Sequence, residues 1–154
     1  MREILFRGKN TDSGEWAEGY LVQTQSHTYI IQPGWYKDDL FISLYNIIDE
    51  VDPETVGQFT GLTDKNGKKI FEGDLLNGFQ YPFYRSESAD HNYFAEVIWF
   101  TGNCAFGLYT HKHQTAKVRG ISAGNADFIE DFDSDDWEVI GNIHDNPELL
   151  EATT

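Results

Sequence analysis

The sequence predicts a mainly β protein, either all-β or a β-rich α+β fold. Its 154 residues include fourteen glycines and one methionine, a composition that favours turns and strands over long helices. Runs of β-branched and aromatic residues alternate with clusters of turn formers, as in antiparallel hairpins. The sharpest turn is Asp64-Lys65-Asn66-Gly67, because an Asn-Gly pair readily adopts the positive φ angles of a tight hairpin. We therefore expect a small β-barrel built from antiparallel hairpins, with a short C-terminal helix.

Three strands are predicted in the first third of the chain, at residues 2–8, 15–22 and 27–32. Turn-forming residues at 9–14 join the first two strands into a hairpin. In the second strand, Trp16 and Tyr20 fall on one face because side chains alternate with a period of two. Residues 40–51 fit a helical period as well as broken strands, and their β-propensity favours strand or irregular structure.

Further strands are predicted at residues 93–100, 104–109, 115–118 and 137–143. Before them, Glu72-Gly73-Asp74 turns the chain into an apolar strand that starts at Leu75. Polar and aromatic residues at 78–92 predict a loop, and residues 120–136 are expected to be irregular and acidic. The chain's best helix start is Asn146-Pro147, which predicts a capped helix over residues 148–151.

The composition is that of one ordinary domain over residues 1–154, or of two packed lobes at about 1–62 and 63–154. An apolar fraction of 40% is enough for a core without metals or crosslinks. Cys104 is the single cysteine, which excludes an intrachain disulfide and favours a reducing cytoplasm. No stretch approaches the roughly 20 apolar residues that span a bilayer.

The net charge of −15 is unevenly distributed. Residues 1–120 hold 16 acids and 11 bases, and residues 121–154 hold 10 acids and no Lys or Arg. Such a charge disfavours nucleic acid as a direct ligand, because phosphates require clustered cations. The acidic tail is most simply a solvated face. An alternative is that residues 127–138 imitate a phosphate backbone and inhibit a host DNA-binding protein.

Several motifs occur in an order that is typical of one protein family. They are Arg2-x-Ile4-x-Phe6-Arg7-Gly8-Lys9, Gly14-x-Trp16-x-x-Gly19, the segment 55–62, Asp64-Lys65-Asn66-Gly67, Ile70-x-Glu72-Gly73-Asp74 and the segment 141–150. With them the chain resembles the YopX family of phage and prophage proteins. The resemblance implies a β-rich fold that contains a barrel, and an origin in a mobile element. It implies no activity, because glycine, Asn-Gly and Asn-Pro shape the backbone and carry no chemistry.

Four groups of residues are candidates for metal or catalytic sites. Asp131, Asp133 and Asp135 match the first ligand positions of a calcium-binding loop. Asp136, however, occupies the position where that loop requires glycine. His111-x-His113, with Cys104 and His91 as further ligands, matches no zinc spacing. Cys104 begins an apolar strand and is expected to be a buried small hydrophobe. His144-Asp145-Asn146 is explained by helix capping. We assign no catalytic, cofactor-binding or metal-binding residue.

The sequence therefore favours a non-enzymatic accessory protein that acts by protein–protein contact, with homo-oligomerisation as an extension. Most of the tryptophans and tyrosines are expected in the core. Trp35-Tyr36 follows Pro33-Gly34 in a predicted loop and is a candidate interaction anchor. The predicted partner-binding residues are Trp35, Tyr36, Asp131, Asp133, Asp135 and Asp136. A metal-dependent hydrolase using His111, His113 and acidic residues is the enzymatic alternative.

Overall fold

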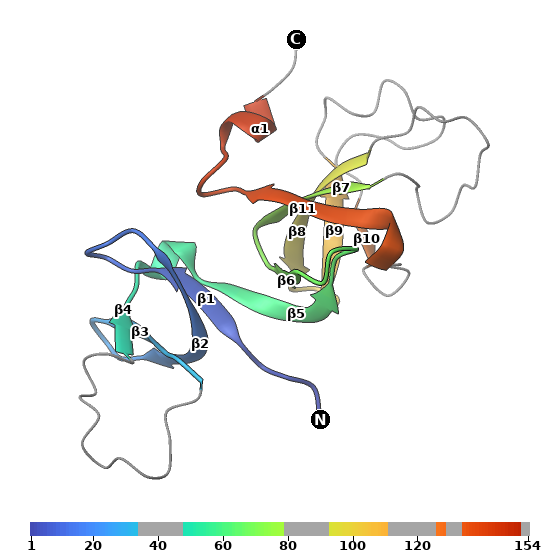
Figure 1. Cartoon of the computed structure of the whole chain (residues 1–154). Coiled ribbons are helices and arrows are strands. Elements are labelled where there is room, and N and C mark those ends of the chain that lie inside the picture. Colours follow the sequence, from blue (N-terminus) through green and yellow to red (C-terminus); the bar gives the residue numbers. More distant parts are fainter. Residues whose placement is uncertain (34–47, 79–92, 111–125, 129–133, 152–154) are drawn as a thin grey trace, which may run out of the picture. The chain divides into compact units, whose positions relative to one another are not determined.

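The computed structural model describes residues 1–33, 48–78, 93–110, 126–128 and 134–151 of the chain (Figure 1). The chain divides into two compact units, Met1–Gly61 and Leu62–Thr154. Its strands form two antiparallel sheets, with the orders β4-β3-β2-β1-β5-β6 and β10-β9-β8-β7-β11. The prediction of a mainly β fold is confirmed. In the described residues neither sheet closes on itself, so the predicted barrel is not confirmed.

The six strands of the first sheet are β1 (Phe6–Lys9), β2 (Trp16–Gln23), β3 (Thr28–Ile31), β4 (Ile48–Glu50), β5 (Gly57–Thr63) and β6 (Lys69–Phe71). The second sheet comprises β7 (Asp74–Gly78), β8 (Tyr93–Phe100), β9 (Ala105–Thr110), β10 (Ala126–Phe128) and β11 (Trp137–Asn142). The remaining elements are the 3₁₀ turns η2 (Pro53–Thr55) and η5 (Ser134–Asp136) and the helix α1 (Glu148–Glu151). In the described part of the chain, no helix has the length and apolar character needed to cross a bilayer.

The first unit is a meander in which β1, β2, β3 and β4 pair in chain order. Its first turn is closed by Asn10, whose Oδ1 accepts the backbone N–H groups of Asp12 and Ser13 at 2.9 Å. One face of the sheet holds a small core of Ala17, Ile30 and Val51. Phe6, Leu21 and Val56 pack against this core. The strands predicted at 2–8, 15–22 and 27–32 are confirmed as β1, β2 and β3.

The second unit is built around β7, which lies between β8 and β11. Its core comprises Ile70, Leu76, Ala95, Val97, Leu108 and Trp137, all buried. The Asn66-Gly67 hairpin is confirmed, with Gly67 at a φ of +78°. The strands predicted at 93–100, 104–109 and 137–143 are confirmed as β8, β9 and β11.

Some predictions were wrong, and others fall on residues that the structure leaves undescribed. Residues 120–136 were expected to be irregular but contain β10, which pairs with β9. A strand of three residues is too short for the alternation of apolar and polar side chains to be recognised in the sequence. Cys104 is exposed in the β8–β9 turn with a φ of +51°, so the predicted buried role is wrong. The strand predicted at 115–118 and residues 40–47 lie outside the described residues.

The helix predicted over residues 148–151 is confirmed as α1, but the role of Asn146 differs. Asn146 Oδ1 accepts the backbone N–H of Asn142 at 3.3 Å, back toward β11. The Asn146 backbone carbonyl, and not the side chain, accepts the N–H of Leu149 at 3.0 Å. Asn142 in turn accepts the N–H groups of His144 and Asp145 through its own Oδ1. The segment after β11 is therefore ordered by side-chain amides that hold the turn.

Candidate partner-binding face

Strand register gathers five apolar side chains on the face of the first sheet that is opposite its core. Tyr20 of β2 is paired with Ile31 of β3, and Ile31 with Ile48 of β4. Two residues further along β2, Val22 is paired with Tyr29 of β3. Directly paired residues of antiparallel strands point to the same face, and alternate residues along a strand do as well. We call Tyr20, Val22, Tyr29, Ile31 and Ile48 the outer apolar face.

Two members of the outer apolar face are strongly exposed. Tyr20 is 53% exposed and Val22 is 39% exposed. Tyr29, Ile31 and Ile48 are half-buried. Single exposed apolar residues are ordinary on a protein surface, whereas contiguous ones from three strands are typical of interaction sites. This face therefore has the composition of a protein-binding surface, with a tyrosine near its centre.

Glu18 and Trp16 extend the outer apolar face along β2. Glu18 is exposed, and in the described part of the chain its side chain forms no hydrogen bond or ion pair. Its cross-strand neighbour Arg7 is only 7% exposed, with its guanidinium 4.6 Å from the centre of the Trp16 ring. Lys9 Nζ lies 5.6 Å from the same ring. Both cations are thus in reach of a cation–π contact with Trp16, and Glu18 is left as an exposed negative charge.

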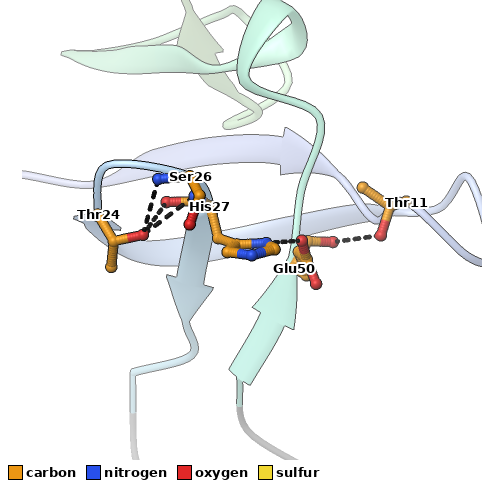
Figure 2. A network of polar contacts seen from close by, with 5 residues as sticks. All are labelled: Thr11, Thr24, Ser26, His27 and Glu50. Carbon is orange, nitrogen blue, oxygen red and sulfur yellow. Dashed lines mark hydrogen bonds and ion pairs between the residues drawn. The ribbon is translucent and has the colours of Figure 1, made fainter.

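A polar network holds the other end of the outer apolar face (Figure 2). His27 Nδ1 lies 2.6 Å from Glu50 Oε1, and the His27 ring is stacked on Tyr29 at 6.0 Å between centroids. Thr24 Oγ1 accepts the backbone N–H of His27 at 3.0 Å and donates to the His27 carbonyl at 3.1 Å. The Glu50 carbonyl accepts the N–H of Thr11 at 2.9 Å. These contacts fix β4 and the β2–β3 turn, and they set the position of Tyr29.

An open hollow of about 470 Å³ lies beside the same sheet. It is lined by residues 1–4, Phe6, Tyr20 and Leu21. Ile4 in this lining is 54% exposed. Most of the lining surface is apolar, and Arg2 and Glu3 supply its charged side chains, so its chemistry is that of a contact surface.

Four of the six predicted partner-binding residues, Trp35, Tyr36, Asp131 and Asp133, lie outside the described residues. Asp135 is exposed and Asp136 is half-buried, both in η5. The histidines proposed as metal ligands, His91, His111 and His113, also lie outside. Among the residues that are described, no group of three or more His, Cys, Asp or Glu side chains could hold a metal.

Comparison with known proteins identifies the family. The model of the YopX protein family matches residues 5–151, nearly the whole chain. This chain belongs to the YopX protein family. The crystal structure of protein EF1440 from Enterococcus faecalis is similar, with a TM-score of 0.50 and 23% identity over 97% of this chain and 99% of that chain. This likeness shows the fold. No curated protein matches the chain.

Sequence reasoning missed the outer apolar face of this YopX protein. Most aromatic residues were expected in the core, but Tyr20 is 53% exposed, and Trp99 is 40% exposed. One signal was available: Glu18 falls on the same face of β2 as Trp16 and Tyr20. A charged residue within an alternating strand indicates that this face is solvated. The contributions of β3 and β4 depend on register and had no signal in the sequence.

Proposed function

We propose that this YopX protein is a non-catalytic accessory protein that binds a protein partner through its outer apolar face. The observation that carries the proposal is the alignment of Tyr20, Val22 and Tyr29 with two isoleucines on one solvated face. Burying such a face in a partner removes apolar area from water, worth roughly 25 cal/mol per Å² before association costs. Aromatic residues at the centre of a contact surface are its most frequent energetic anchors.

The biological setting is part of the same proposal. The family resemblance implies an origin in a phage or prophage, so the partner is a host or phage protein in the bacterial cytoplasm. The net charge of −15 supports a soluble protein that does not bind nucleic acid directly.

Site-specific photocrosslinking tests the proposal. A photoreactive phenylalanine analogue is placed at Val22, and at the exposed Glu54 of η2 as a matched control in the same unit. In extracts of the bacterial host, position 22 is expected to give a discrete adduct that unlabelled protein competes away. The Tyr20→Lys variant is expected not to compete, because a charge within the face opposes its burial. Equal adducts from both positions would contradict the proposal.

The two alternatives stay predictions. In the acidic-mimic hypothesis residues 127–138 present charge to a host DNA-binding protein, but Glu138 is already paired with Lys65 at 2.7 Å. In the hydrolase hypothesis the metal ligands His111 and His113 lie outside the described residues. Metal analysis of the purified protein, with thermal shift on addition of Zn²⁺, tests the hydrolase hypothesis. Competition with DNA for a host DNA-binding protein tests the acidic-mimic hypothesis.

A further inference from the structure

We propose that the outer apolar face binds a polypeptide segment that carries an arginine or lysine beside an apolar residue. The basic side chain is held between the Glu18 carboxylate and the Tyr20 ring. The inference rests on the proposed function, because it names the chemistry of the partner at that same face.

Glu18 and Tyr20 are placed for joint recognition of a cation. They lie two residues apart on β2 and therefore on one face, with Cα atoms roughly 6.6 Å apart at a strand rise of about 3.3 Å per residue. Both are exposed, and neither side chain forms a hydrogen bond, ion pair or ring contact within the described residues. An extended basic side chain can donate to a carboxylate while its stem or guanidinium covers a neighbouring ring.

The same strand already shows this chemistry inside the molecule. Four residues before Tyr20 and on the same face, the Trp16 ring has the Arg7 guanidinium at 4.6 Å and Lys9 Nζ at 5.6 Å. Those cations come from β1, which pairs with β2 at Trp16 and Glu18. Tyr20 instead has the apolar Ile31 of β3 as its cross-strand neighbour. An external cation can therefore take at Tyr20 the place that Arg7 and Lys9 take at Trp16.

Charge decides between the classes of occupant. Nucleic acids and anionic membranes are repelled by a chain of net charge −15 that presents an exposed carboxylate at this face. A second copy of the chain would bring like charges together, which is unfavourable. A basic segment is attracted, and its apolar residue covers Val22 and Ile31 next to the cation.

Two blocked peptides test the inference: Gly-Leu-Arg-Leu-Gly, and a twin with neutral citrulline in place of arginine. Each is titrated into the ¹⁵N-labelled full chain while amide shifts are recorded. The arginine peptide is expected to shift amides of β2 and β3 and to bind about five- to tenfold more tightly than its twin. Glu18→Gln and Tyr20→Ala are each expected to weaken binding about threefold, whereas Tyr20→Phe keeps the ring and the affinity. Glu54→Gln, at an exposed position of η2, is the matched control and should change nothing.

The outcomes separate this inference from the proposed function. Equal binding of the two peptides at β2 and β3 would overturn the basic-segment inference and leave an apolar docking face. If neither peptide shifts the amide signals of β2 or β3, both the basic-segment inference and the proposed binding face would be overturned. A concentration-dependent dimer that Tyr20→Lys dissociates would assign the face to a second copy and overturn the inference as well. Amide spectra of the free variants show whether each substitution preserves the fold.

Discussion

Asp64 and Val139 lie 75 positions apart in the chain, yet Asp64 Oδ2 accepts the backbone N–H of Val139 at 3.0 Å. The other carboxylate oxygen accepts the N–H groups of Asn66 and Lys68 at 2.9 Å. The Lys65 N–H donates to the carbonyl of Trp137 at 3.0 Å. Because β11 is the last strand of its sheet, this turn covers backbone groups on its outer edge. One carboxylate thus joins a local hairpin to a distant edge strand.

Replacing Asp64 with alanine should destabilise the second unit by roughly 3 kcal/mol. The substitution removes a charged acceptor from three backbone N–H groups and leaves the Val139 N–H without its partner. Urea unfolding followed by tryptophan fluorescence measures the loss. Asp12→Ala, in the exposed β1–β2 turn, is the matched control and should stay within about 0.5 kcal/mol. Equal losses in the two variants would refute this role for Asp64.

The contribution of Asp64 should depend on pH. Burial raises the pKa of its carboxyl, but the N–H groups of Val139, Lys68 and Asn66 lower it more, so the net pKa lies below the ordinary 3.8. A folded-state pKa below the unfolded one stabilises the fold above about pH 3.8, and this stability is lost as pH falls through the folded value. The stability difference between wild type and Asp64→Asn should therefore shrink in that acid range. A difference that stays constant with pH, measured by urea unfolding, would contradict the prediction.

Lys65→Met should raise the pKa of Glu138. The hydrogen bond from Lys65 Nζ to Glu138 Oε2, at 2.7 Å, and the positive charge of Lys65 hold this pKa below its ordinary value. Carboxyl ¹³C NMR titration of Glu138 measures the change directly. Because both side chains are partly exposed, global stability should hardly change. Lys68→Met is a control on the same turn and should leave the Glu138 pKa almost unmoved.

Gly78→Ala should cost about 1–3 kcal/mol of stability. Gly78 is paired with Trp137 across β7 and β11, and a Cβ at Gly78 would lie 2.7 Å from Trp137 Cε3. Trp137 is only 3% exposed, so its ring has little room to move. Gly102→Ala is the control, since a Cβ there meets nothing within 4 Å. Thermal unfolding of both variants tests the prediction, and a Gly78→Ala melting temperature equal to wild type would disprove it.

Local chemistry in the sequence was sufficient for the hairpins. Asn66-Gly67 predicted a tight turn because glycine adopts a positive φ at no steric cost, and Gly67 has a φ of +78°. The alternating strand at 93–100 was predicted with the bounds that β8 has. The barrel was not confirmed, because closure depends on which strands meet at the sheet edges, and no local pattern carries that information.

The candidate site was less accessible to sequence reasoning. Period two placed Trp16 and Tyr20 on one face, as the structure confirms, but did not tell which face would pack on the core. Ile31 and Ile48 join Tyr20 only through the pairing of three strands. Cys104 was expected to be buried as the first residue of an apolar strand, yet the strand begins one residue later and leaves Cys104 in the turn.

From the chain of amino acids alone, most of the strands, the Asn-Gly turn, the terminal helix and the family could be recognised, because each is encoded in short local segments. Sheet order, the contact of Asp64 with Val139 and the exposure of Tyr20 came from the folded molecule. Each of these depends on how segments that are distant in sequence pair with one another. That pairing is selected by the burial and hydrogen bonding of the whole fold.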